Sequence, residues 1–207
     1  MAGSAVIVLL AAGEGRRFGS LKQLADIDGE PMVRRSARQA IDSGAPVIVV
    51  TGVDAERVES ALTGLSVHIV RNMAWAKGMG SSIALGMSEL HRHFPQATGA
   101  LLCLADQPMI EQALFQALLR RHQAAGDRIL ASEHAGVTGP PVLFPRDCFQ
   151  TLMNWSGAEG ANALLRQESA RVERFSNHGG SDVDTPDDLQ RVRETTGLTA
   201  PSRRPGC

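Results

Sequence analysis

The sequence predicts a single α/β domain built around a mainly parallel β-sheet. Three continuous apolar runs, 5–10, 46–50 and 99–104, have the length and composition of strands that are buried on both faces. Segments with a helical pattern separate these runs, and this alternation is typical of a parallel sheet covered by helices. The 207 residues suit one sizeable core, and we find no internal repeat or linker that would divide them.

The remaining elements follow from shorter patterns. Weaker strands are expected at 67–70 and 128–130, and a short extended run at 142–144. The segment SDVDTPDDL contains an Asp or Thr N-cap candidate, a first-turn proline and further acids, which indicates the start of a last helix. We expect one domain over 1–196 and a disordered tail over 197–207. The other expected helices are 32–41, 55–62, 82–93, 111–124, 146–153 and 161–167.

Composition excludes several classes of function. The chain has 21 basic and 22 acidic residues, a net charge of −1, so it lacks the basic excess of a nucleic-acid-binding or membrane-binding surface. The apolar stretch 5–12 is too short to span a bilayer and has no preceding Lys or Arg, unlike a signal peptide. Cys103, Cys148 and Cys207 form no CxxC pair. We therefore expect a cytoplasmic protein in a reduced compartment.

The first strand leads into a glycine-rich, basic loop, LLAAGEGRRFGSLKQL (9–24). Its Gly13-x-Gly15 start resembles a dinucleotide fingerprint, but Phe18 stands where the third glycine belongs and no acid follows about 20 residues later. The Gly-Lys-Ser/Thr of a P-loop is also absent. Arg16, Arg17 and Lys22 around exposed backbone N–H groups would suit a polyphosphate, although an ordinary solvated turn has the same composition.

A polyphosphate site normally needs a divalent cation, and Mg²⁺ prefers carboxylates. Asp106 follows the buried run GALLCLA, where an uncompensated carboxylate is costly. It is either a metal ligand, which we favour, or the N-cap of the next helix. Asp182 and Asp184 are the other metal candidates, and we favour Asp184. Asp187 and Asp188 fit the first turn of the last helix better.

A second glycine-rich segment and three histidines are further candidates for a functional role. In KGMGSSI (77–83), Gly80, Ser81 and Ser82 fit a helix start, with Ser81 or Ser82 either capping the helix or contacting a nucleotide. The histidines His68, His91 and His93 show no ligand spacing with a nearby Cys or Glu, so we expect them to be surface or core residues rather than zinc ligands.

Taken together, LLAAGEGRRFGSLKQL, GMGSSI, LADQPMI and DVDTPDDL resemble the MobA-like NTP transferases, the nucleotidyltransferases of molybdenum cofactor biosynthesis. The resemblance extends from the first strand to about Leu189 and is greatest to the cytidylyltransferase branch, because Ala12 stands where guanylyltransferases typically have Gly. It implies a Rossmann-like three-layer sandwich of the nucleotide-diphospho-sugar transferase type. It also implies Mg²⁺-dependent transfer of CMP from CTP to molybdopterin with release of pyrophosphate.

The resemblance also implies roles for individual residues. Arg16, Lys22 and Asp106 would be catalytic, and Asp106 and Asp184 would bind the metal. A molybdenum hydroxylase would be a possible recipient of the product. The expected nucleotide-binding set is Leu10, Ala11, Ala12, Gly13, Gly15, Arg16, Lys22, Gly80, Ser81, Ser82 and Asp106.

Two departures from the family pattern keep alternatives open. Gly139-Pro140-Pro141 replaces the usual Gly-His-Pro, and Ala158 and Asn162 replace a carboxylate and a guanidinium. Both segments belong to the half expected to meet the acceptor. Transfer to a sugar phosphate or polyol phosphate, use of GTP, and a non-catalytic accessory protein that delivers the cofactor to an enzyme are the alternatives.

Overall fold

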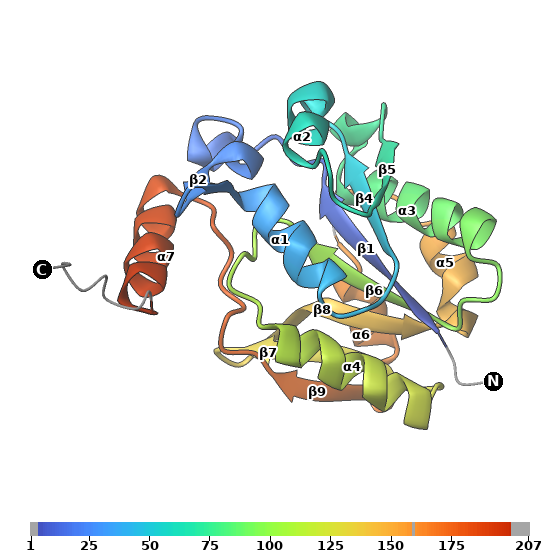
Figure 1. Cartoon of the computed structure of the whole chain (residues 1–207). Coiled ribbons are helices and arrows are strands. Elements are labelled where there is room, and N and C mark those ends of the chain that lie inside the picture. The colour runs from blue at the N-terminus through green and yellow to red at the C-terminus, as the bar shows by residue number, and fades with distance from the viewer. Residues whose placement is uncertain (1–3, 159, 200–207) are drawn as a thin grey trace, which may run out of the picture.

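The structure, a computed structural model, describes residues 4–158 and 160–199 and is organised around one mixed sheet (Figure 1). Its seven strands lie in the order β5-β4-β1-β6-β8-β7-β9. The β5, β4, β1 and β6 strands are parallel, as are β7 and β9, while β8 runs antiparallel to both of its neighbours. The strands are β1 (Ala5–Ala11), β4 (Val47–Thr51), β5 (His68–Arg71), β6 (Gly99–Leu104), β7 (Ile129–His134), β8 (Val137–Pro145) and β9 (Val172–Ser176).

Helices cover both faces of this sheet and complete three layers. Along β1, Ile7 and Leu9 pack into the core cluster under α1, α2 and α4, while Val6 and Val8 pack into the cluster under α3, α5 and α6. Because successive strand side chains alternate between faces, a strand buried on both sides is apolar throughout. The helices are α1 (Met32–Ile41), α2 (Ala55–Ala61), α3 (Met79–His93), α4 (Gln112–Ala124), α5 (Phe149–Met153) and α6 (Asn162–Gln167).

The order of the strands creates a crevice at one edge of the sheet. From β1 the chain moves outward to β4 and β5, and then returns to β6 on the other side of β1. The connection that leaves β1 therefore leads toward β4, whereas the connection that leaves β6 leads the other way along the sheet, past β8 to β7. Such switch points are where α/β sheets bind ligands. The predicted Rossmann-like three-layer architecture is confirmed, and it places the loops 12–24 and 105–111 beside each other.

A small subdomain lies at one end of the sheet. The hairpin β2 (Asp26–Ile27) and β3 (Glu30–Pro31) packs near the last helix, α7 (Pro186–Thr199), as Figure 1 shows. Ile27, Val183 and Leu189 are buried together in a third hydrophobic cluster. Helix α7 includes 197–199, which are part of the predicted disordered tail. Residues 200–207 of that tail lie outside the described residues.

Some elements differ from the sequence-based prediction. β9 and the β2–β3 hairpin were not predicted, and β8 is much longer than the expected run 142–144. β9 reads VERFS and has no buried residue, so its periodicity carries little apolar signal. Among the described residues, no helix combines the length and apolarity needed to cross a membrane.

Gly86 offers a test of this packing, because α3 lies against β1 and β4 at that point. A Cβ at Gly86 would lie 2.5 Å from Val8 Cγ1 and 3.0 Å from Val50 Cγ2. We expect Gly86→Ala to lower the free energy of unfolding by about 1–3 kcal/mol through overpacking. Gly197→Ala is the matched helical control, since a Cβ there would have no neighbour within 4 Å; it should be neutral or stabilising. Urea denaturation measures both, and a wild-type value for Gly86→Ala would contradict the packing.

Candidate functional site

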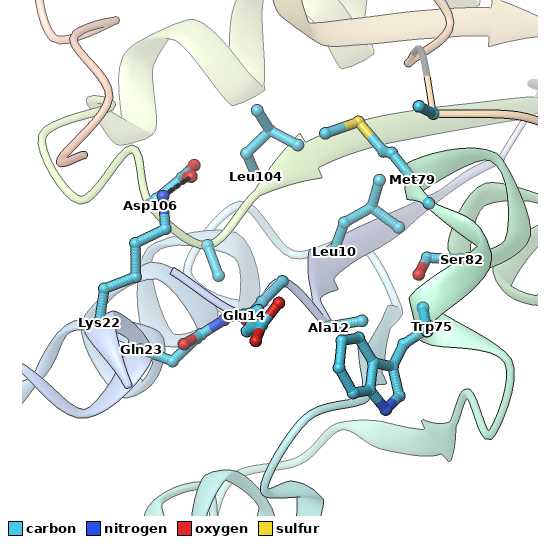
Figure 2. A pocket seen from close by; sticks show the side chains of 15 residues that line it. Leu10, Ala12, Glu14, Lys22, Gln23, Trp75, Met79, Ser82, Leu104 and Asp106 are labelled. Carbon is cyan, nitrogen blue, oxygen red and sulfur yellow. Dashed lines mark hydrogen bonds and ion pairs between the residues drawn. The ribbon is translucent and has the colours of Figure 1, made fainter. Parts of the chain in front are cut away.

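A cavity of about 330 Å³ lies at the carboxyl ends of β1 and β6, in the crevice that the strand order creates (Figure 2). Its lining comes from the loop after β1, the turn after β6, the approach to α3, and one residue of the α5–α6 connection. The lining residues are Leu10, Ala12, Gly13, Glu14, Lys22, Gln23, Trp75, Ala76, Gly78, Met79, Ser82, Leu104, Ala105, Asp106 and Ala158.

The cavity has a charged end and an apolar side. Figure 2 shows Lys22 and Asp106 facing each other at one end, with Leu104, Leu10 and Met79 along one side of the cavity. Leu10 and Leu104 reach it because they pair with each other near the carboxyl ends of the adjacent strands β1 and β6. A pocket with an apolar wall and convergent charged groups is the usual form of a small-molecule site.

The charged end is a compact network around one ammonium group. Lys22 Nζ donates to Asp106 Oδ2 at 2.6 Å and to Asp184 Oδ1 at 2.9 Å. The exposed Arg17 guanidinium donates to the other oxygen of Asp184, Oδ2, at 2.6 Å. The side chain of Lys22 is only 10% exposed, against 21% for Asp106 and 25% for Asp184. The network therefore holds a nearly buried cation between two partly buried carboxylates.

These contacts keep Lys22 charged. Burial alone would lower the pKa of Lys22. The Coulomb interactions and hydrogen bonds with Asp106 and Asp184 outweigh this effect, so the net pKa lies above its ordinary value. The amine is therefore cationic at neutral pH. The structure thus brings Lys22 together with both of the carboxylates that the sequence marked as metal candidates.

Backbone contacts explain how residues so far apart in the chain converge. Lys22 begins a short 3-10 turn (Lys22–Leu24), and Asp106 lies in the turn after β6. The backbone N–H of Val183 donates to the Asp106 carbonyl oxygen at 2.8 Å, which fixes the 182–184 segment beside that turn. Gln107 Nε2 also donates to Asp182 Oδ1 at 2.8 Å. The loop before α7 is thereby bound to the turn after β6.

The helix caps show which acidic residues are available for other roles. α4 begins at Gln112, so the alternative role of Asp106 as an N-cap is excluded. At α7, Thr185 Oγ1 accepts from the Asp188 N–H while the Thr185 N–H donates to Asp188 Oδ2, a reciprocal capping arrangement. Thr185 is thus the cap, which leaves Asp184 directed to Lys22 and Arg17.

The donor set fits a divalent cation. Asp106 and Asp184 already converge on one positive charge, and Asp106 Oδ1 is buried without a hydrogen-bond partner among the described residues. Asp182 is less suited: partial loss of water around its carboxyl group, and then the Asp106 charge, raise its pKa, and its Oδ1 is engaged by Gln107. The geometry favours Asp184 over Asp182 as the partner of Asp106.

The loop after β1 is held by Gln23, which the sequence analysis did not single out. Gln23 is buried, and its Nε2 donates to the carbonyl oxygens of Gly13 and Ala11, the latter at 3.4 Å. Gly15 adopts a left-handed conformation (φ 66°) before the 3-10 turn Arg16–Phe18. The side chain of Arg16 lies outside what the structure describes. No sequence pattern distinguishes Gln23 from an ordinary loop residue.

The second glycine-rich segment differs from the expectation. Helix α3 begins at Met79 with Gly78 as its N-cap, so neither Ser81 nor Ser82 caps it. Gly78 (φ 101°) and Gly80 pack against 156–158, where a Cβ on either would lie 2.7 Å from backbone atoms. Ser82 faces the cavity, whereas the Ser81 hydroxyl donates to the Gly78 carbonyl at 2.8 Å. The close backbone approach, rather than a hydroxyl cap, decides where the helix starts.

The lining therefore contains part of the expected nucleotide-binding set. Leu10, Ala12, Gly13, Lys22, Ser82 and Asp106 line the cavity; Ala11, Gly15, Gly80 and Ser81 are not in its lining. Met79, which belongs to the predicted KGMGSSI segment, also lines the cavity. Glu14 and Trp75 line it as well, although no binding role was predicted for either; Trp75 lies just before that segment, which is the clearest signal for it in the sequence. Of the two departures from the family pattern, Ala158 lines the cavity, whereas Pro140 and Pro141 lie within β8.

The strand order and the charged cavity at its switch point define a nucleotide-binding α/β domain. Residues 7–172 match the model of the MobA-like NTP transferase domain, and the chain belongs to this family. It is therefore a nucleotidyltransferase, and the family resemblance in the sequence is confirmed.

Named relatives cover almost the whole chain. A probable molybdenum cofactor guanylyltransferase of Natronomonas pharaonis is 28% identical, over 90% of this chain and 96% of its own length. The molybdenum cofactor cytidylyltransferase of Escherichia coli K12 is 23% identical, over 90% of this chain and 94% of its own. Among solved structures, Rv0371c of Mycobacterium tuberculosis H37Rv has a TM-score of 0.80 and 26% identity, covering 94% of this chain and 99% of its own. The same protein has also been solved in complex with manganese.

Gly13 separates a binding role from a folding role. A Cβ at Gly13 would have Gln23 Nε2 as its nearest neighbour, at 3.9 Å, and its backbone is not left-handed. Gly13→Ala should leave the unfolding free energy within about 1 kcal/mol of wild type. It should weaken nucleotide binding about tenfold or more, because the added methyl group enters the cavity. Gly139→Ala, equally uncrowded but outside the cavity, is the matched control. Calorimetric titration with CTP measures the effect, and equal affinity in both variants would refute it.

Proposed function

We propose that this enzyme transfers CMP from CTP to the phosphate of molybdopterin and releases pyrophosphate, with Mg²⁺ as its cation. The observation that carries the proposal is the Lys22–Asp106–Asp184 network at one end of the cavity, in a chain of the MobA-like family. The names of the two curated relatives, both molybdenum cofactor nucleotidyltransferases, support the choice of acceptor.

The proposed reaction needs positioned cations but no general base from the protein. A phosphate oxygen of the acceptor attacks the α-phosphorus of CTP, the bond from that phosphorus to the oxygen bridging to the β-phosphate breaks, and pyrophosphate leaves with the electron pair. The attacking phosphate is already anionic near neutral pH, so no general base is needed. The main obstacle is repulsion between anions, which positioned cations reduce.

Lys22 and the carboxylates supply this electrostatic function. Because its pKa is raised, Lys22 carries a full charge at neutral pH and can hold phosphate oxygens of the leaving group. Arg16 and Gly13 belong to the same loop and would contact the triphosphate. Asp106 and Asp184 would hold Mg²⁺, which offsets charge on the triphosphate when it is bound.

The choice of base rests on Ala12. Ala12 lines the cavity at the end of β1, and its methyl group stands against Gly52 on the β4 side. The sequence resembles the cytidylyltransferase branch at this position, although the relatives' names include a guanylyltransferase and a cytidylyltransferase. We propose CTP as the substrate, with GTP as the alternative.

A different small phosphorylated acceptor is the second candidate. Ala158 lines the cavity where the family pattern has a carboxylate, so the acceptor side has lost a charged group. This loss favours a different acceptor, such as a sugar or polyol phosphate. A non-catalytic carrier of the cofactor is disfavoured for another reason, because the charged network suited to a leaving pyrophosphate is retained. If the product is the cytosine dinucleotide cofactor, its recipient would be a molybdenum hydroxylase.

The decisive assay measures pyrophosphate release from CTP and from GTP, with Mg²⁺ and with molybdopterin or without it. Lys22→Met and Asp106→Asn should each lower turnover about 100-fold or more, because a preorganised electrostatic group is lost. Asp127→Asn, an exposed aspartate beyond α4, is the matched control and should retain full turnover.

Circular dichroism should show that Lys22→Met and Asp106→Asn are folded. Release that depends on molybdopterin and prefers CTP supports the proposal. Release with sugar phosphates alone identifies the second candidate, and binding of CTP without any release would indicate a carrier. Near-normal release by either folded site variant would refute the assignment of the residues.

A further inference from the structure

A second group of polar side chains lies far from the cavity, where β5 meets the last turn of α3. His68 is the first residue of β5, and Glu89 and His93 lie one turn apart on α3. His68 Nε2 lies 3.1 Å from Glu89 Oε2, and His93 Nε2 lies 3.2 Å from the same oxygen. The ligand atoms of the three residues all lie within 4.8 Å of one another. The two imidazoles and one carboxylate therefore converge on one point.

We propose that His68, Glu89 and His93 form a binding site for a transition-metal ion of the Zn²⁺ class. Two imidazoles and one carboxylate are a common ligand set for such an ion, which leaves a fourth position to water. Ligands in a tetrahedral Zn²⁺ site, with bonds of about 2.0–2.1 Å, stand about 3.3 Å apart. The two nitrogen–oxygen separations already match that spacing, so the site needs little rearrangement.

The surroundings allow an ion to enter. The histidine side chains are 35% and 39% exposed, while that of Glu89 is only 13% exposed. Arg92 also donates to Glu89 Oε2 at 2.8 Å, so its guanidinium shares this oxygen with the two imidazole nitrogens. Arg92 is 67% exposed and can turn away into solvent when an ion takes its place. The other ligand atoms, Nε2 of both histidines, are of the type that binds such ions in neutral imidazole.

This group is separate from the carboxylates of the cavity. His68 pairs with Ile48 near the amino ends of β5 and β4, whereas the cavity lies at the carboxyl ends of β1 and β6. Glu89 follows Met79, a cavity residue, by ten positions, which is about 15 Å along a helix. An ion here would cross-link the edge strand β5 to α3 and so stabilise the packing of the helix whose first turn lines the cavity.

The sequence spacing had indicated no metal site among the histidines. Glu89 and His93 do have the i, i+4 spacing of helical ligand pairs, which is the one local signal of this group in the sequence. The third ligand, His68, comes from another element 21 residues before Glu89, and only the tertiary structure brings it close.

The test is a Zn²⁺ titration of the untagged full chain, followed by calorimetry, in millimolar Mg²⁺ so that Mg²⁺ occupies the carboxylates of the cavity. We expect one Zn²⁺ per chain with a dissociation constant in the micromolar range or below. His68→Ala and His93→Ala should each weaken binding at least tenfold. His91→Ala is the matched control, because it lies on the same helix turn but outside the group; it should bind as wild type.

A second readout is thermal unfolding. Zn²⁺ should raise the melting temperature of the wild type and of His91→Ala, but not that of His68→Ala. Glu89→Gln, which keeps the shape of the side chain, provides an independent variant and should also bind at least tenfold more weakly. Absence of Zn²⁺ binding by the wild type, or binding that persists unchanged in His68→Ala and His93→Ala, would overturn the proposal.

Discussion

The ammonium group of Lys22, held between Asp106 and Asp184, is the contact on which the geometry of the site depends. The two ion pairs span 84 and 162 positions in the sequence, and they join the loop after β1, the turn after β6 and the segment before α7. None of these segments belongs to an α-helix or a β-strand, so contacts between the segments contribute strongly to their relative positions. A nearly buried cation whose carboxylate partners are removed is left without compensation, which is strongly destabilising. The arrangement of the three segments therefore depends on the compensation of the Lys22 charge by the two carboxylates.

The same charge balance suits the proposed reaction. Lys22 and Arg17 together balance the charges of Asp106 and Asp184, so negative charge does not accumulate at this end of the cavity. Under the proposed function, Asp106 and Asp184 would hold the Mg²⁺ that accompanies CTP, and the ammonium group of Lys22 would then be available to phosphate oxygens. Gln23 keeps the loop carbonyls of Ala11 and Gly13 in place during this exchange, because it contacts the backbone rather than the charged groups. The groups that hold these loops together are thus also those assigned to binding the substrate.

Local patterns in the sequence were sufficient for the centre of the fold. The buried runs that became β1, β4 and β6 are apolar because both of their faces are covered, and this signal is strong. β9 and the β2–β3 hairpin are partly exposed or very short, so their patterns are weak. The predicted cap at Ser81 or Ser82 was wrong because the start of α3 depends on a close backbone contact between Gly78 and 157–158, which no local pattern reveals.

The site was predictable to the extent that its residues have unusual chemistry for their position. Lys22 and Asp106 stood out as charges next to buried strands, and the structure brings them within 2.6 Å of each other. Gln23 and Trp75 are ordinary residue types for loops, so only the fold shows that they line the cavity. Likewise, the choice between Asp182 and Asp184 depended on which carboxylate Gln107 engages.

A double-mutant cycle on the free energy of unfolding tests the central claim most directly. Lys22→Met, Asp106→Asn and the double variant would be compared with wild type by urea denaturation without divalent cations. If the ion pair holds the loops together, the two substitutions should be coupled by about 1–3 kcal/mol, the double variant being less destabilised than the sum of the single ones. Additive effects, with a coupling energy near zero, would contradict the account.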